Sequence, residues 1–195
     1  PPFAIEECPI QTAAVISDWN LAYALLEKNL TRFDVVLCDK PGVTVFRRNG
    51  VNAHHPFPIY SQDSRVHHPY PVEKDIDVVM VGNLNHAAHA TRARYLERLA
   101  KLSDQYRIVI ATNFVGEAYG MLLSRARIVF NHSIRSELNM RFFETLACGS
   151  LAFLEESNSE VGDWCRDGHE VVLYNSRISR RSCTTISPTP TRLRP

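Results

Sequence analysis

The chain has 195 residues, of which 45% are hydrophobic and 22% charged, a composition typical of a soluble globular protein with a sizeable core. Its formal net charge is +1, and no stripe of basic residues marks a nucleic-acid binder. No apolar run reaches the roughly 18 residues of a membrane span, so we expect soluble partners. Five scattered cysteines without a CxxC pair favour reduced thiols, and the first residues do not resemble a signal peptide, so we expect a cytoplasmic protein.

Short runs rich in Val and Ile alternate with helical patterns along the chain. These runs are continuously apolar, which predicts strands buried on both faces. The expected strands are 12–18, 34–39, 76–82, 107–112, 127–132, 150–155 and 170–174. The expected helices are 19–30, 41–49, 88–104, 116–125, 139–148 and 159–166. This alternation predicts an α/β fold with parallel sheets and right-handed crossovers.

A connection divides this pattern into two halves. Residues 52–73 contain four of the eleven prolines and four histidines, with no helical or strand period, so they read as an extended segment. We therefore expect one α/β unit over 1–72, including the connection, and a second over 73–175. Residues 176–195 offer little to bury and are expected to form a disordered tail.

Small and polar residues recur where the expected strands end. Ligands of open α/β sheets bind beyond the carboxyl ends of the strands. Gly82 would let a backbone approach a phosphate, and the helix that begins near Asn139 would offer free N–H groups to an anion. The candidate rim is Gly82-Asn83, Thr112-Asn113, Asn131-His132-Ser133 and Glu155-Glu156.

The helix expected over 139–148 carries charges beside its apolar face. Its predicted apolar stripe is Met140, Phe143 and Ala147. Glu144 lies about 40° from Met140 on a helical wheel, at the border of that stripe. One interpretation makes Glu137, Arg141 and Glu144 exposed helix pairs worth about 0.2 to 0.5 kcal/mol each. The other makes them ligand contacts. Gly149 is expected to follow the helix in a left-handed conformation.

Several segments keep a recognisable order between residues 14 and 174. They are DWNLAYALLEKNLTRFDVVLCDKPGVTVFRRNG, HHPFPIY, DIDVVMVGNLN, FNHS, NMRFFETLACGSLAFLEE and RDGHEVVLY. Together they resemble the CgeB-like, family 1 and 4 type glycosyltransferases. The resemblance implies a GT-B fold of two Rossmann-like units, the first of them incomplete here. It also implies transfer of a hexose from a nucleotide-sugar to a glycan, lipid or protein acceptor.

The same resemblance assigns roles to individual residues. Glu144 matches the glutamate that holds the ribose hydroxyls of the donor, and Arg141 would contact the diphosphate or the sugar. Combined with the residues at the strand ends, this gives the expected donor-binding set Gly82, Asn83, Asn113, Asn131, Ser133, Asn139, Arg141 and Glu144, and we expect no metal and no further cofactor. Retaining members often carry a second glutamate at the position of Ser136, with Glu137 here one step later. The sugar contact therefore falls to a shifted turn, or to the backbone and Asn139, and the stereochemical outcome stays open.

Other residues have competing interpretations. The pairs His54-His55 and His67-His68 lack a partner set for a metal, and His86 and His89 are typical of an exposed loop. Arg92 and Arg94 could bind diphosphate or be solvated, since basic residues at a helix N-terminus oppose its dipole. The alternative function is a truncated, non-catalytic nucleotide-binding fragment. A flavodoxin-like module is weaker, because no acidic cluster follows the first strand.

Overall fold

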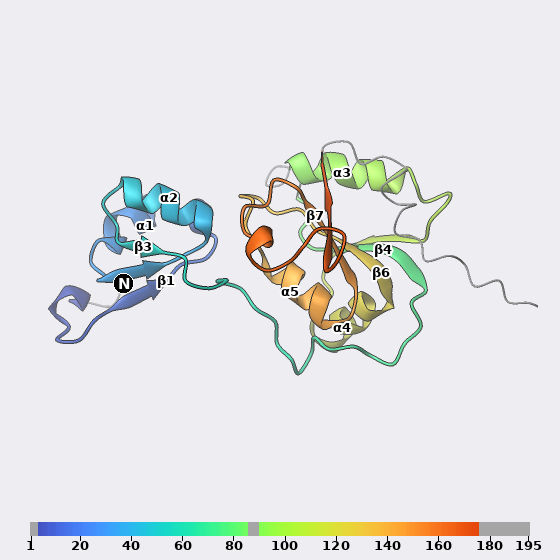
Figure 1. Cartoon of the computed structure of the whole chain (residues 1–195), viewed down its shortest axis with the longest axis horizontal. Helices are drawn as coiled ribbons and strands as arrows, with labels where there is room; N and C mark the ends of the chain where they lie inside the picture. Colours follow the sequence, from blue (N-terminus) through green and yellow to red (C-terminus); the bar gives the residue numbers. More distant parts are fainter. Residues whose placement is uncertain (1–3, 86–89, 176–195) are drawn as a thin grey trace, which may run out of the picture.

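The computed structural model describes residues 4–85 and 90–175 (Figure 1). The expected tail over 176–195, the loop residues His86 and His89, and Cys183 lie outside the described residues. The chain forms two parallel sheets, one of three strands and one of five, joined by an extended connection. This confirms the α/β class and the parallel pairing.

The first sheet has the strand order β1-β2-β3, with β1 at Ala13–Val15, β2 at Val35–Leu37 and β3 at Ala53–His54. The helical segments are η1 (Ile5–Glu7), η2 (Trp19–Leu21), α1 (Tyr23–Leu30) and α2 (Lys40–Arg48). Helix α2 begins where Asp39 accepts a hydrogen bond from Gly42 N at 2.6 Å, and proline occupies the first turn. The core of this unit is built around Val36, Cys38 and Phe46, none of which is exposed.

Strand β3 corrects the sequence prediction, which made the whole of 52–73 an extended connection. Ala53 is fully buried and pairs with Val36, and Val36 N donates to the carbonyl of Asn52 at 2.9 Å. Two residues are too few to show a strand period. The pairing is supplied by β2, which lies far away in the sequence.

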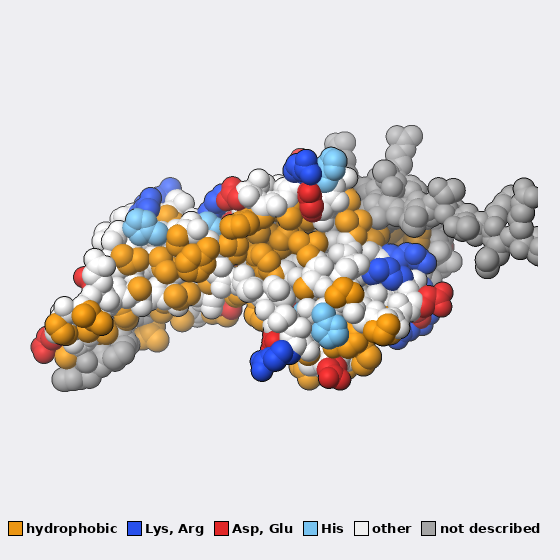
Figure 2. Space-filling model, turned by 60° about the horizontal axis from the view of Figure 1, so that its bottom comes forward, with side chains coloured by type: hydrophobic (Ala, Val, Ile, Leu, Met, Phe, Trp, Pro, Cys, Tyr) orange, Lys and Arg blue, Asp and Glu red, His pale blue; other side chains and the backbone are white. Residues whose placement is uncertain are grey.

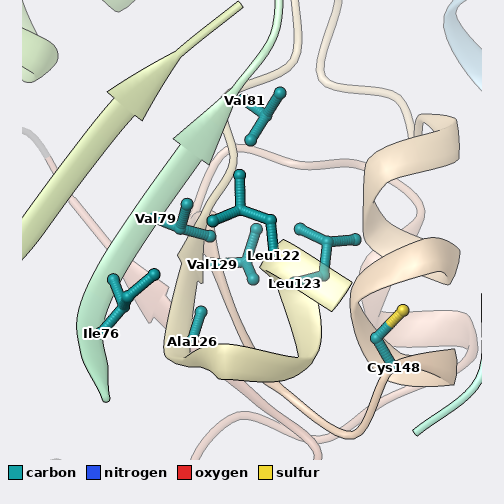
Figure 3. Packing of buried hydrophobic residues seen from close by; sticks show 8 residues of the cluster. All are labelled: Ile76, Val79, Val81, Leu122, Leu123, Ala126, Val129 and Cys148. Carbon is teal, nitrogen blue, oxygen red and sulfur yellow. The ribbon is translucent and has the colours of Figure 1, made fainter. Parts of the chain in front are cut away.

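The second sheet has the order β5-β4-β6-β7-β8, and its described pairs are all parallel. The strands are β4 (Ile76–Val81), β5 (Ile108–Ala111), β6 (Ala126–Phe130), β7 (Leu151–Glu155) and β8 (Val171–Tyr174). The helices are α3 (Ala90–Ala100), α4 (Gly116–Arg125) and α5 (Met140–Ala147). Leu122 and Leu123 of α4 pack against Val79 and Val129 (Figure 3), whereas Leu99 of α3 packs on the opposite face.

The helix predicted over 159–166 is wrong, because only the 3-10 turn η3 (Val161–Asp163) forms there. The Asn158 side chain accepts hydrogen bonds from the backbone N–H groups of Glu160 and Val161, both at 3.0 Å. A side chain that captures these donors competes with a helix. None of the described helices is long and apolar enough to cross a membrane.

The predicted apolar stripe of α5 is also wrong in its phase. Met140 is 49% exposed, while Phe142 and Thr145 are each 1% exposed. Phe142 packs in one buried cluster with Leu154 and Val171, so the face of α5 that carries Phe142 is the one turned to the core. After the helix, Gly149 has a φ of 71°, which confirms the expected left-handed conformation.

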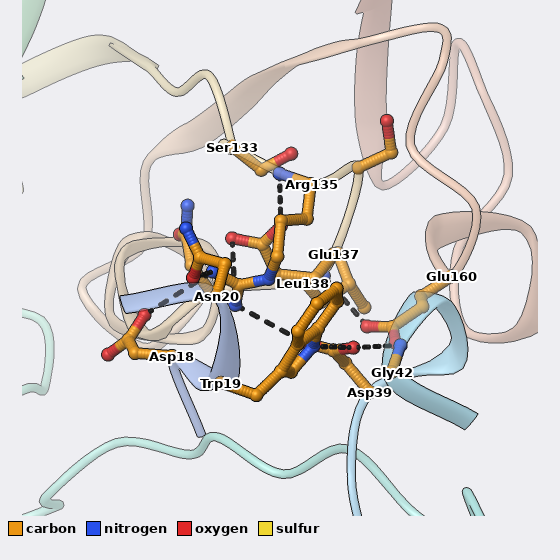
Figure 4. A network of polar contacts seen from close by, with 12 residues as sticks. Asp18, Trp19, Asn20, Asp39, Gly42, Ser133, Arg135, Glu137, Leu138 and Glu160 are labelled. Atoms are coloured by element: carbon orange, nitrogen blue, oxygen red, sulfur yellow. Dashed lines mark hydrogen bonds and ion pairs between the residues drawn. The ribbon is translucent and has the colours of Figure 1, made fainter. Parts of the chain in front are cut away.

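A polar network holds the two units together (Figure 4). Glu160 accepts hydrogen bonds from Lys40 N of the first unit and from Leu138 N of the second, both at 2.7 Å. Arg135, beyond β6, donates to Asn20 and, at 3.2 Å, to Asp39. The loop after β6 is thereby fixed against the first unit, which makes one wall of the site described next.

Hydrophobic side chains also gather on the surface of the first unit, where Figure 2 shows them as a band over the N-terminal part of the molecule. Val15 of β1 is 60% exposed, and Leu21 and Leu25 in the following helical segments are 76% and 70% exposed. The second unit places most of its large apolar side chains inside its sheet faces.

Candidate functional site

Two adjoining cavities lie at the carboxyl end of the five-stranded sheet. The α5 cavity, of about 250 Å³, is lined by Asp18, Tyr60, Arg92, Tyr119, His132, Ser133, Ile134, Glu137, Asn139, Met140, Arg141 and Glu144. The α3 cavity, of about 470 Å³, is lined by Ala90, Thr91, Arg92, Tyr95, His132, Ser133, Ile134, Ser136, Glu155 and Ser157. They share Arg92, His132, Ser133 and Ile134, so one bound molecule could extend through both.

Glu144 is held by two aromatic side chains. It is only 7% exposed, its Oε2 accepts a hydrogen bond from Tyr119 Oη at 2.8 Å, and its Oε1 lies 3.7 Å from His67 Nε2. His67 Nδ1 accepts from Asp63 N at 3.2 Å, so in the neutral ring the proton is on Nε2, facing Glu144. Burial raises the pKa of Tyr119, which keeps its hydroxyl a donor. Glu144 is therefore a fixed acceptor on the cavity wall.

The interpretation of the α5 charges as exposed helix pairs is wrong. Glu137 is 4% exposed and accepts a hydrogen bond from Arg135 N at 2.7 Å rather than pairing along the helix. Arg141 Nη1 donates to Asn131 Oδ1 at 2.9 Å. Glu144 bonds to Tyr119 instead of Arg141. These side chains are oriented by neighbours from other elements.

Arg141 rests on a pair of amides and a glycine. The Asn131 and Asn139 side chains donate to each other, at 2.9 and 3.0 Å, which orients the Asn131 oxygen that Arg141 binds. The Arg141 guanidinium lies so close to Gly82 that a Cβ at this position would overlap it. In the structure Gly82 thus makes room for Arg141, while the sequence suggested that it admits a phosphate. Among the described residues, the buried Nε of Arg141 has no hydrogen-bond partner.

Arg92 brings a second cation to the same place, and this one is buried. It is 6% exposed, and its Nη2 donates to the carbonyl oxygen of Asn83. Burial and the charge of Arg141 lower the pKa of Arg92 to about 10. Within residues 4–85 and 90–175, no carboxylate lies within ion-pair distance of Arg92 or Arg141. Two neighbouring guanidiniums without an internal counter-charge favour an anionic ligand.

The other predicted site residues have different positions. Ser133 is buried, and its N and Oγ both donate to Glu155 Oε1, the first at 3.0 Å. The Asn83 side chain accepts from Asn85 N at 2.8 Å, and Asn83 lines a smaller cavity of about 220 Å³ beside α3. Asn113 is exposed, has a φ of 63°, and lines neither of the two cavities defined above.

Sequence reasoning missed or left undecided several residues that line the two cavities, among them Arg92, Tyr119, His132 and Glu155. Arg92 had two equal interpretations, and His132 and Glu155 were noted only because they end strands. Tyr119 comes from α4 and has no local pattern that would mark it. The signal available for Arg92 was an arginine early in a predicted helix, where its charge opposes the helix dipole.

His132 links the two cavities chemically. Burial and the charge of Arg92 lower the pKa of His132 to about 4, so the ring is neutral near pH 7. Tyr174 Oη donates to Asn131 O and lies 2.8 Å from His132 Nδ1. Since the tyrosine proton is used on the carbonyl, Nδ1 carries the imidazole proton and Nε2 is an acceptor.

The histidine pairs of the connection do not converge on one point. His54 and His55 contact Asn52 and Cys38 O, at 2.8 and 2.9 Å. His67 faces Glu144, and His68 stacks on Tyr70. Over the described parts of the chain, no group of three or more His, Cys, Asp or Glu side chains is arranged to hold a metal ion.

A family model described as "Glycosyl transferase-like" matches residues 66–183, which is more than half of the chain. The chain belongs to this glycosyl transferase-like family. The matched range includes the five-stranded sheet and most of the lining of both cavities. No curated protein matches the sequence significantly.

Solved structures give the fold of this glycosyl transferase-like chain. It is similar to the pneumococcal O-GlcNAc transferase GtfA in complex with UDP and GlcNAc, with a TM-score of 0.55 and 10% identity over 90% of the chain. It is also similar to the GtfA/B complex, with a TM-score of 0.50 and 11% identity over 89% of the chain. At these identities the likeness shows the fold alone, which is the GT-B fold. The chain covers 44% of each of these longer proteins.

Proposed function

We propose that the chain binds a nucleotide-sugar in the α5 cavity and belongs to a glycosyltransferase that moves the hexose to a glycan, lipid or protein acceptor. The observation that carries this proposal is the convergence of Arg92 and Arg141 on one cavity, where the described part of the chain supplies neither of them with a carboxylate partner. A diphosphate supplies the missing negative charge. Within this proposal the protein is of CgeB-like type.

A diphosphate would meet three sets of donors in the α5 cavity. Arg141 presents a guanidinium fork, which matches phosphate oxygens better than a point charge would. Arg92 adds a second cation across the cavity. The Asn139 side chain makes no capping bond to α5, and Phe142 N donates to the Asn139 carbonyl at 3.1 Å, which leaves the N–H groups of Met140 and Arg141 for an anion. Together they would also stabilise the charge that develops on the departing diphosphate.

Glu144 is suited to the ribose of the same ligand. A carboxylate can accept hydrogen bonds from both hydroxyls of a vicinal diol, and partial burial strengthens these bonds. Tyr119 occupies Oε2 and leaves further acceptor capacity on both oxygens. The family membership supports a transferase, and the GtfA neighbour was solved with UDP and GlcNAc.

The reaction exchanges one glycosidic bond for another. The bond between the anomeric carbon and the diphosphate oxygen breaks, a bond to the acceptor oxygen forms, and the acceptor hydroxyl loses its proton. We propose no metal and no cofactor other than the donor, since the two arginines can take the charge of the leaving group. The acceptor would approach from the side of Asp18 and Tyr60, which line the α5 cavity from the first unit and its connection.

The division of the protein follows from the same proposal. Residues 1–72 would be the last part of the acceptor-side unit with the connection, and 73–175 the donor-binding unit. We place the protein in the cytoplasm, since Cys8, Cys38, Cys148 and Cys165 are free thiols.

A second candidate is a nucleotide-binding fragment without transferase activity. The three-stranded first sheet and the 44% coverage of the solved structures favour it. The two candidates share the α5 cavity and differ in turnover: a complete enzyme releases sugar to an acceptor, whereas the fragment only binds.

The binding site can be tested by calorimetry with uridine, UDP, and UDP-, GDP- and ADP-sugars. Glu144→Gln should weaken nucleoside and nucleotide binding by about 1.5 to 3 kcal/mol, the range for a hydrogen bond to a charged group. It should leave the fold intact, because Gln keeps the shape and removes a buried charge. The matched control is Glu117→Gln, an exposed carboxylate on α4. Equal affinities of wild type and Glu144→Gln would refute the ribose assignment.

A further inference from the structure

The α3 cavity contains a buried carboxylate with an unused oxygen. Glu155 is 4% exposed, and its Oε1 takes both donors of Ser133. Its Oε2 is buried and has no hydrogen-bond partner among the described residues. His132 Nδ1 lies 3.8 Å from Oε2, too far for a hydrogen bond, and its proton is directed to Tyr174. An acceptor left in this state calls for a donor from a ligand.

The rest of the cavity wall is rich in hydroxyl groups. Thr91, Ser136 and Ser157 line it from three different loops or helix ends, and Tyr95 adds an aromatic ring beside them. Hydroxyls both donate and accept, and an aromatic face packs on apolar C–H groups. This combination suits a ligand that has many hydroxyls and some apolar surface, which describes a sugar ring.

The position of the cavity connects this ligand to the diphosphate. Arg92, His132 and Ser133 belong to both cavities, so a group attached to a diphosphate at Arg92 can reach past His132 toward Glu155. Ser136, which has no carboxylate of its own, lies on the same wall as Glu155. Among the described residues that line the α3 cavity, Glu155 is the one carboxylate, and it is the last residue of β7.

We infer that the α3 cavity holds the glycosyl group of the donor, and that Glu155 Oε2 accepts a hydrogen bond from a hydroxyl or amide N–H of that sugar. The inference rests on the proposed function, because it requires the diphosphate in the α5 cavity. Glu155 then contributes to the affinity for the sugar and not to the affinity for the nucleotide.

The test compares a bare nucleotide with its sugar conjugates. Calorimetry would measure UDP, UDP-glucose and UDP-GlcNAc, and GDP with GDP-mannose, on wild type and on Glu155→Gln. Gln keeps an acceptor for Ser133, so the fold should persist. We expect at least one sugar conjugate to bind wild type more tightly than its nucleotide. Glu155→Gln should weaken binding of that sugar conjugate about tenfold and change the affinity for the bare nucleotide by less than about twofold.

The controls separate the site from the fold. Glu156→Gln makes the same change at the next residue, which is exposed and lies outside the lining of the α3 cavity, and should change no affinity. Ser157→Leu fills the cavity from its rim without touching the bonds of Glu155, and should weaken the sugar conjugates alone. This variant decides the question if Glu155→Gln lowers the melting temperature strongly.

The outcomes distinguish the two proposals. If wild type binds the nucleotides but gains nothing from any sugar, the sugar assignment is wrong and the nucleotide site stands. The same holds if Glu155→Gln and Ser157→Leu both keep the full gain. If wild type binds neither nucleotide nor conjugate, the proposed function is wrong and this inference falls with it.

Discussion

Arg135 and the pair Arg92 and Arg141, which all lie near the end of β6, differ in how their charge is balanced. Arg135 has a side chain that is 7% exposed, and carboxylates of Asp39, Glu137 and Asp18 lie 3.2, 3.7 and 3.7 Å from its guanidinium nitrogens. Its guanidinium also lies over the Trp19 ring, 5.5 Å from the centroid. In contrast, Arg92 and Arg141 donate to a peptide carbonyl and an amide.

This difference separates a structural charge from a binding charge. Removing an ion from water costs several kcal/mol unless nearby groups of opposite charge compensate. The chain compensates Arg135 from within, across the boundary between its two sheets. It leaves Arg92 and Arg141 side by side without a counter-charge in its described part, and in the proposed function the diphosphate of the ligand compensates them.

The largest loss of stability is expected from removing Arg135, whose charge is compensated by carboxylates of the chain. Arg135→Ala would leave the buried carboxylates of Asp39 and Glu137 without their cation, and should lower the free energy of unfolding by about 3 to 5 kcal/mol. Chemical denaturation followed by tryptophan fluorescence measures this loss. Arg135→Lys keeps the charge and should recover part of it. A loss below about 1 kcal/mol for Arg135→Ala would contradict the structural role.

The uncompensated set should respond in the opposite way. Arg141→Gln removes one of two neighbouring cations, so the stability should hold or rise slightly, while UDP binding weakens by about 1.5 to 3 kcal/mol. Uridine, which lacks phosphate, should be little affected in calorimetry. Arg94→Gln, an exposed cation on α3, is the matched control. A variant that loses stability but keeps UDP affinity would make Arg141 structural, like Arg135.

The pKa of His132 is lowered by burial and by the charge of Arg92, so the free energy of unfolding should depend on pH. Its pKa in the folded protein is about 4, below the ordinary value of 6.5, so the unfolded chain takes up the proton first. The stability from the neutral ring is complete above about pH 6.5 and is lost as the pH falls toward 4. Between pH 7 and 5 the loss should be about 2 kcal/mol.

The comparison with His132→Gln isolates this contribution. The groups around the ring are Arg92 of α3, Tyr95, Tyr174 of β8 and Glu155 of β7. Burial raises the pKa of Glu155, so the contribution of Glu155 to stability falls as the pH rises. Wild type and His132→Gln share this contribution, so it cancels when the two are compared. The wild-type curve should therefore fall more steeply in acid. Bound UDP should raise the pKa of His132, measured by NMR, because it neutralises Arg92.

The smallest effect is expected from an ion pair that is exposed. Arg65 pairs with Asp63 at 2.7 Å, but the Arg65 side chain is 88% exposed. Water screens this pair, so Arg65→Ala should leave the denaturation midpoint unchanged. A clear loss would mean that pairing alone, without burial, accounts for the effect of Arg135.

Much of the fold could be read from the pattern of apolar runs. All seven expected strands form, because continuous Val and Ile runs suit strands covered on both faces. The sequence missed β3, whose two residues are stabilised by a distant partner, and it overextended 159–166, where Asn158 captures the donors of a helix. The order β5-β4-β6-β7-β8 is a property of pairing between segments and has no local signal.

The site was predictable in its location and less so in its members. Asn139 stands out because it precedes a helix beyond a buried strand, whereas Arg141 and Glu144 stand out as charges beside an apolar stripe and through the resemblance to glycosyltransferases. The apolar stripe of α5 misled, since Phe142 rather than Met140 faces the core. The sequence marks Glu155 only as a polar residue at the end of a strand. Its Oε2 lacks a partner in the described structure because Ser133 N and Oγ both donate to Oε1.

The sequence by itself determined the alternation of strands and helices, the left-handed glycine after α5, and the polar rim at the strand ends. These follow from local rules, which act over a few residues of the chain. The tertiary structure alone decided which charges are compensated: Arg135 meets Asp39, 96 residues away, while Arg141 meets Asn131 and the bare backbone of Gly82. The energy of a buried charge depends on its neighbours in space, and only the folded chain brings those neighbours together.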